Sequence, residues 1–132
     1  MSAEVEFQRS IYTALNALSG FDVYDIAPQA EDGGSLAAFP YVTFGARALT
    51  EWDTQSEAGF DGLIRLHTWS RTGSNMECLT IQAQIYAALH LQSLPISAHN
   101  TVLVRREATN IFPEGDGKVH GVCEYRILFE AT

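Results

Sequence analysis

The stretch RLHTWSRTGSN, residues 65–75, joins two elements without a spacer, and the rest of the fold is built around this junction. Arg65, His67 and Trp69 alternate with the residues between them, which is the pattern of a strand whose neighbouring side chains point to opposite faces. We expect Trp69 to anchor the strand, either in the core, which is favoured, or against a neighbouring chain. We interpret His67 as a structural or interface group and not as a catalytic one.

A helix is predicted directly after this strand. Ser74 and Glu77 match the S-x-x-E capping box, in which both side chains accept hydrogen bonds from free amides at the helix start. The helix is expected to run to about Leu91, because Pro95 follows. Its apolar residues fall on two sides, so we expect the rest of the fold to cover it well. The two sets are Met76, Leu79, Ala83 and Tyr86, and Ile81, Ile85, Ala88 and Leu89.

A second amphipathic helix is predicted over residues 3–18. Apolar residues recur there at steps of three and four. Ser2 is a suitable N-cap and Gly20 a suitable end. A short extended piece follows at residues 21–28. Residues 29–38, QAEDGGSLAA, have the composition of a loop and are the best candidate for a mobile segment.

Two strands are predicted between these helices. The first begins after Pro40, a position where proline is tolerated, and alternates with Val42 and Phe44 on one face and Leu49 on the other. The second covers residues 60–70, after a polar connection. Both are long enough to span a small sheet.

The last third of the chain predicts a β-hairpin. Residues 101–112 and 118–131 flank the turn sequence PEGDG, which contains the dipeptide Asp116-Gly117. One parity of the final strand is apolar and the other polar, as expected for a sheet with one buried and one polar face. The apolar set is Val119, Gly121, Cys123, Tyr125, Ile127 and Phe129, and the polar set is His120, Glu124, Arg126 and Glu130.

This order of elements, with mostly short connections, predicts an α+β fold. We expect an antiparallel sheet of about four strands with two helices packed on one face. A chain of 132 residues is most simply one domain, so residues 1–132 are expected to form a single one. The second sheet face then carries aromatic and charged residues, which a monomer tolerates and an oligomer can use.

Charge and composition exclude several functional classes. The chain has 16 acidic and 8 basic residues, a formal charge of -8, whereas proteins that wrap duplex nucleic acid need clustered Lys and Arg. The N-terminal residues lack the basic and apolar regions of a signal peptide. No run approaches the roughly 20 apolar residues of a membrane span. We therefore expect a cytosolic protein at synthesis.

The sequence contains none of the common catalytic motifs that we sought. The nucleotide-binding glycine loops, the G-x-S-x-G elbow and H-E-x-x-H are all missing. His67 and His120 both fall on strands and are able to meet, but Cys123 has the opposite parity to His120, which disfavours a Cys/His pair. Cys78 and Cys123 are expected to be buried free thiols. We predict no catalytic residue, no cofactor and no metal site.

Four side chains are candidates for an interface: Trp52, Arg71, Arg105 and Arg126. Arginine and tryptophan are enriched where protein chains meet. The alternative for the arginines is ordinary surface charge opposite Glu107, Glu124 and Glu130. Trp52 is expected near the surface because Asp53 follows it.

The order of several motifs resembles a family of small phage and prophage proteins associated with tail completion. The resemblance covers nearly the whole chain. The motifs are IYTALNAL at 11–18, VYDIAP at 23–28, FPYVTFG at 39–45, EWDT at 51–54, LHTWSRTGS at 66–74 and GKVHGVCEYRILFE at 117–130.

The resemblance implies a tail terminator of long-tailed phages or gene transfer agents, with a small α+β fold and no catalytic residue. Such proteins form a hexameric ring on the finished tail tube, stop the addition of tube subunits and join the tail to the head connector. The implied partners are copies of the chain, the tube protein and the connector protein, while DNA passes through the ring without specific binding. The implied location is the host cytoplasm during assembly and then the neck of the virion, with no membrane. The alternative function is a small bacterial ligand- or protein-binding module without catalytic activity.

Overall fold

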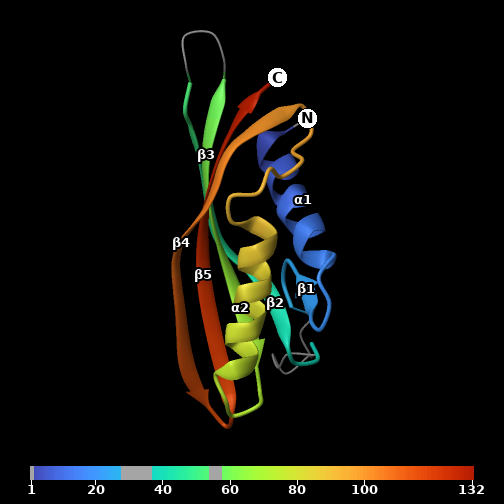
Figure 1. Cartoon of the computed structure of the whole chain (residues 1–132), viewed down its shortest axis with the longest axis vertical. Coiled ribbons are helices and arrows are strands. Elements are labelled where there is room, and N and C mark those ends of the chain that lie inside the picture. The colour runs from blue at the N-terminus through green and yellow to red at the C-terminus, as the bar shows by residue number, and fades with distance from the viewer. Residues whose placement is uncertain (1, 28–36, 54–57) are drawn as a thin grey trace.

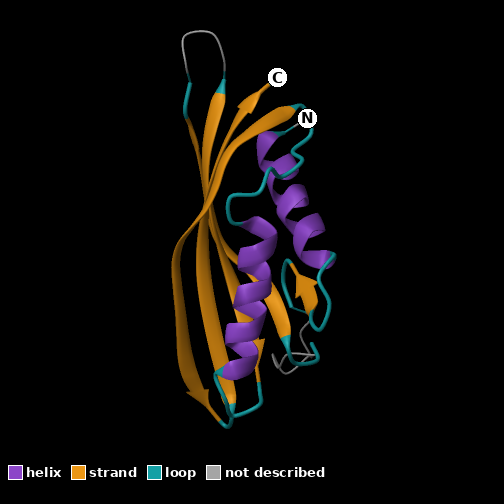
Figure 2. Ribbon diagram, in the orientation of Figure 1, coloured by secondary structure: helices purple, strands orange, loops and turns teal. Residues whose placement is uncertain are grey.

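A computed structural model describes residues 2–27, 37–53 and 58–132 and has two layers. One sheet of five described strands has the order β1-β2-β3-β5-β4, and both helices lie on the same face of it (Figures 1 and 2). The predicted α+β fold is therefore confirmed. The elements are α1 Ala3–Asn16, β1 Asp22–Tyr24, β2 Tyr41–Glu51, β3 Gly59–Ser70, α2 Met76–Leu89, β4 His99–Gly115 and β5 Lys118–Ala131.

The additional strand is β1, which the sequence indicates only as an extended piece. It has three residues, too few to show an alternation, and it pairs in parallel with Tyr41–Thr43 of β2. All other strand pairs are antiparallel, as predicted. The predicted mobile segment 29–38 lies outside the described residues except for Ala37 and Ala38.

A β-bulge interrupts β2 and changes its parity. The register against β3 shifts between Phe44 and Arg47. Because a bulge adds one residue to one strand, Leu49 lies on the same face as Phe44 and packs against the core. The prediction that Leu49 and Phe44 lie on opposite faces was therefore wrong.

The start of α2 differs from the predicted capping box. The helix begins at Met76, whose N–H donates to Ser74 Oγ at 3.2 Å, and it ends at Leu89. The Glu77 side chain accepts from the hydroxyl of Ser70 at 2.6 Å instead of from a helix amide. The reciprocal box was wrong, because Glu77 joins the helix to the end of β3.

The core lies between the helices and the sheet. It contains Phe7, Ile11, Leu15, Ile64, Leu66, Ile81, Ile85, Leu89, Tyr125, Ile127 and Phe129, together with other apolar residues. The predicted alternation of β5 is confirmed from Val119 to Glu130. The turn at Asp116 and Gly117 has positive φ angles of 54° and 76°, as two-residue hairpin turns of type I′ require. No helix in the described part of the chain is long and apolar enough to cross a membrane.

Cys78 and Cys123 are buried free thiols, as predicted. Burial raises the pKa of Cys123 to about 12, and burial followed by the Glu77 charge raises that of Cys78. Since the thiolate is the reactive form, we expect neither cysteine to react with a thiol reagent in the folded protein at neutral pH. Mass spectrometry should find both labelled only after unfolding in denaturant. Labelling of Cys123 under native conditions would contradict its placement.

Candidate functional site

The sheet face away from the helices, here called the outer face, carries a row of aromatic rings across four strands. Tyr41, Trp69, His120 and Phe112 lie opposite one another on β2, β3, β5 and β4. Successive ring centroids are 6.3, 3.9 and 6.2 Å apart, and the rings of Trp69 and His120 are almost parallel. The row ends in Phe112, which is 47% exposed. We call these four residues the aromatic row.

Trp69 belongs to this row and not to the core, so the favoured prediction of core packing was wrong. The core side of β3 carries the buried residues Leu66, Thr68 and Ser70, and Trp69 has the opposite parity. Its indole N–H donates to Thr43 Oγ1 at 3.1 Å. The indole is thus held in place on the outer face, half-buried, by its neighbours on the sheet.

His67 lies beside the aromatic row and contacts His120, which belongs to it. His67 Nδ1 lies 2.7 Å from His120 Nε2, and His120 Nδ1 lies 3.0 Å from Glu114 Oε1. The His67 ring lies against β2 at Gly45, where a Cβ atom would collide with the imidazole. Burial, followed by the charges of His120 and Arg65, lowers the pKa of His67. A hydrogen bond between two imidazoles needs one donor and one acceptor, so the pair is compatible with at most one extra proton.

The histidine pair gives a testable pH dependence. Because the pKa of His67 is lower in the folded protein than in the unfolded chain, the unfolded chain binds more protons below about pH 6.5. The contribution of neutral His67 to the free energy of unfolding is therefore expected to be fully present above that pH. It should be lost as the pH decreases through the folded-state pKa of His67. His67→Gln should flatten this dependence in urea titrations at several pH values. His99→Gln, at a ring that contacts Phe60 and Phe129 and neither histidine of the pair, is the control for the substitution itself.

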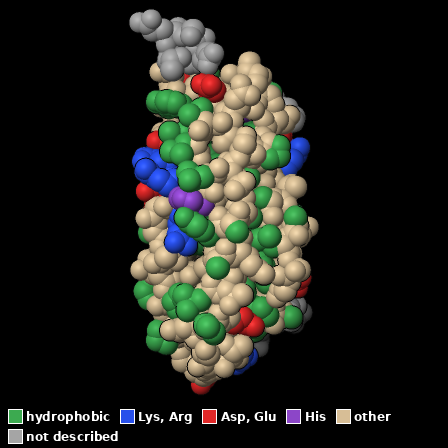
Figure 3. All heavy atoms as spheres, in the orientation of Figure 1, with side chains coloured by type: hydrophobic (Ala, Val, Ile, Leu, Met, Phe, Trp, Pro, Cys, Tyr) green, Lys and Arg blue, Asp and Glu red, His purple; other side chains and the backbone are tan. Residues whose placement is uncertain are grey.

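Charged side chains form a network on the outer face, six residues along β5 from the aromatic row, and bring two predicted interface residues together. Arg105 and Arg126 lie opposite each other on β4 and β5. Glu107 bridges them, with its Oε1 2.9 Å from Arg105 and 3.7 Å from Arg126, and Arg126 also contacts Asp61 at 3.0 Å. Figure 3 shows acidic and basic side chains mixed along the side of the molecule where β4 runs.

The other two predicted interface residues lie at opposite ends of β3. Trp52 follows β2, is 39% exposed as predicted, and its N–H donates to Gly59 O at the start of β3. Arg71 follows the end of β3, with its guanidinium carbon 5.6 Å from the centre of the Phe39 ring. The four candidates therefore do not form one cluster.

One side of α2 is an apolar surface that sequence reasoning missed. Met76, Leu79, Ala83 and Tyr86 are exposed, and the exposed fractions of Met76 and Leu79 are 67% and 50%. The prediction of a well-covered helix was wrong, because only the side with Ile81, Ile85 and Leu89 faces the sheet. The two apolar sides in the sequence are the signal, since a helix on one sheet face buries a single stripe. We call the four exposed residues the α2 stripe.

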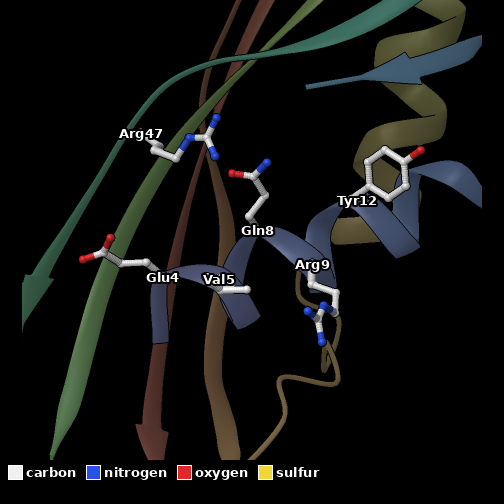
Figure 4. A pocket seen from close by; sticks show the side chains of 6 residues that line it. All are labelled: Glu4, Val5, Gln8, Arg9, Tyr12 and Arg47. Atoms are coloured by element: carbon white, nitrogen blue, oxygen red, sulfur yellow. The ribbon is translucent and has the colours of Figure 1, made fainter. Parts of the chain in front are cut away.

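A groove of about 560 Å³ runs between α1 and β2. Figure 4 shows five side chains of α1 and the guanidinium of Arg47, which extends from β2 toward the helix. The lining residues are Glu4, Val5, Gln8, Arg9, Tyr12 and Arg47. Arg47 also contacts Asp25 at 2.9 Å. Within the described residues, no three or more of the His, Cys, Asp and Glu side chains are grouped so that they could hold a metal ion.

Comparisons with known proteins agree with the fold and give a family. A family model described as "Tail completion protein gp17" matches residues 12–130. A solved chain from the "Virion of native gene transfer agent (GTA) particle" is similar over 98% of both chains, with a TM-score of 0.77 and 16% identity, which shows a shared fold. A search of curated proteins finds no match.

Proposed function

Because the chain belongs to the tail completion protein gp17 family, we propose that it caps the tail tube of a phage or phage-like particle. Its role in the virion is structural. The cap would end polymerisation of the tube and provide the surface to which the head connector binds. The family membership is the observation that carries this proposal. We further propose that residues 1–132 form one domain without enzymatic activity.

The cap is proposed to be a homo-hexameric ring. Subunits in a ring contact each other head to tail, so each must offer two different surfaces. The aromatic row and the α2 stripe are two unlike surfaces on opposite faces of the subunit, and both are rich in apolar atoms. Contact between them would cover Phe112 on one subunit and Leu79 on the next.

The remaining candidates are proposed to contact other proteins of the neck. Trp52 and Arg71 lie at the two ends of β3, and the long axis of the molecule runs along this strand (Figure 1). If that axis crosses the ring, these two residues would lie on opposite rims, one toward the tube protein and one toward the connector. Arg105 and Arg126 would lie at the edge of the subunit contact.

The charge of the chain supports passage of DNA through the ring. A formal charge of -8 raises the energy of bound phosphate, so DNA would move past the ring without specific binding. The protein would act in the host cytoplasm during assembly and then remain in the neck of the virion, without a membrane partner.

Electron microscopy of purified tube protein tests this function. Tubes assembled with the protein should stop at a defined end that carries a ring, whereas tubes assembled alone should continue to grow. Leu79→Glu should prevent ring formation, because it places a carboxylate in the proposed contact, and Gln84→Glu on the same helix serves as a control. Uncapped tubes of unlimited length in the presence of the wild-type protein would refute the proposal.

A further inference from the structure

The second half of β2 has an open edge. β1 pairs only with Tyr41–Thr43, and among the described residues no other strand pairs with β2 on that side. The N–H of Trp52 donates to Gly59 O at 2.7 Å. This bond determines which residues of β2 direct their backbone groups toward β3 and which direct them away from it. Hydrogen-bonded pairs alternate along an antiparallel ladder, so the N–H and C=O groups of Arg47, Leu49 and Glu51 point to the open edge. Such an edge is a template for another strand.

The open stretch, RALTE at residues 47–51, is complementary to itself. If two copies pair antiparallel about Leu49, Arg47 of each copy lies opposite Glu51 of the other, and Leu49 lies opposite Leu49. Arg47, Leu49 and Glu51 are also the residues whose backbone groups point to the open edge. The same register therefore allows both the backbone hydrogen bonds and the charge pairs. We propose that the free protein forms a two-fold dimer through this pairing of β2 with β2 of a second copy.

The charges at both ends of this register are available for the contact. Glu51 is exposed and forms no ion pair with any described residue. The Arg47 guanidinium contacts one Asp25 oxygen, and its five N–H donors leave capacity for a second carboxylate. Two Arg47–Glu51 pairs would therefore flank the Leu49 contact on one face of the joined sheet.

The groove beside α1 adds a second surface to the same contact. It adjoins the open edge, and Arg47 lines it (Figure 4). Val5 and Tyr12 on α1 are 51% and 39% exposed. A two-fold axis at Leu49 would bring α1 of the second copy alongside, antiparallel, on the same sheet face. The dimer would cover these two side chains as well as the backbone edge.

The dimer goes beyond the proposed cap and does not depend on it. A two-fold contact uses the same surface on both copies and is closed, so it cannot add a third copy through that edge. It would keep the edge from pairing with other strands before the protein reaches a tail. The protein can cap tubes without forming the dimer, and it can form the dimer without capping tubes.

Sedimentation equilibrium of the purified full chain tests the pairing. The wild type should be a dimer at high concentration and dissociate on dilution. Glu51→Lys should weaken the dimer about tenfold or more, because both symmetric contacts change from attraction to repulsion. The double variant R47E/E51K exchanges the charges and should restore most of the affinity. Asp22→Lys makes the same charge change on β1, away from RALTE, and should dimerise like the wild type.

Three results would overturn the proposal. They are a wild type that stays monomeric at every accessible concentration, a dimer that Glu51→Lys leaves unchanged, and a double variant as weak as Glu51→Lys. Thermal unfolding of each variant at low concentration checks that the monomer is intact. The capping assay on the same variants separates this contact from the ring, since loss of the dimer with normal capping would leave the proposed function standing.

Discussion

Phe129→Ala is expected to lower the free energy of unfolding by about 3–5 kcal/mol. The Phe129 side chain is fully buried, and its ring centroid lies 5.8 Å from that of Phe7 and 5.2 Å from that of Phe60. Phe7 belongs to α1, so Phe129 joins the first helix to the sheet. Its truncation removes apolar contacts and leaves a cavity at this junction. Urea titration followed by circular dichroism measures the change.

Leu128→Ala is the matched control for this variant. Leu128 is the preceding residue on β5 but faces the outer side and is only half-buried. Its truncation is expected to cost less than about 1 kcal/mol. Equal losses for the two variants would contradict the alternation of β5.

Gly121→Val is expected to destabilise the fold by about 3 kcal/mol and to loosen α2. A Cβ atom at Gly121 would lie 2.7 Å from Nε2 of the buried residue Gln82, which donates to Asn110 O. Movement of the helix away from the sheet would break the contacts of Cys78 Sγ with two sheet carbonyls, at 3.7 and 3.8 Å. Valine would therefore displace Gln82 and leave its buried amide without an acceptor.

Hydrogen exchange distinguishes this local effect from general unfolding. Amides of α2 should exchange faster in Gly121→Val, whereas those of α1 should change less. Ala108→Val adds a larger side chain at an exposed position of β4 and should leave stability within about 0.5 kcal/mol of the wild type. A Gly121→Val protein as stable as the wild type would show that α2 does not lie against β5 here.

The sequence predicted the elements whose pattern is local. Period-two alternation identified both faces of β5, and the Asp116-Gly117 dipeptide identified the hairpin turn. Steps of three and four residues identified α1, and its predicted cap is present, since Ser2 Oγ accepts from the Val5 N–H at 3.5 Å. Each of these signals depends on residues a few positions apart.

The features that were missed depend on contacts between distant residues. The bulge in β2 leaves no mark in the sequence, whose apolar and polar residues alternate across it. The bulge places Leu49 on the core face. Trp69 was expected in the core because large aromatic side chains are usually buried there. Only the pairing of β3 with β5, which places Trp69 opposite His120, shows that it belongs to the outer face.

The candidate interface residues were identified by type, and their positions needed the sheet register. Arg105 and Arg126 are 21 positions apart in sequence, yet they are direct neighbours across β4 and β5. The His67–His120 contact was left open because both lie on strands whose pairing was unknown. The α2 stripe was missed because the sequence shows two apolar sides of the helix without showing which one faces the sheet.

Because Trp69 stacks on His120, the fluorescence of Trp69 can report on binding at the outer face. An indole 3.9 Å from an imidazole is a fluorophore next to a quencher whose strength depends on its protonation. Any molecule that settles on this face should change the emission of Trp69 without an added dye. With Trp52 replaced by phenylalanine, the remaining signal would come from Trp69 alone, and stopped-flow mixing could then follow docking in real time.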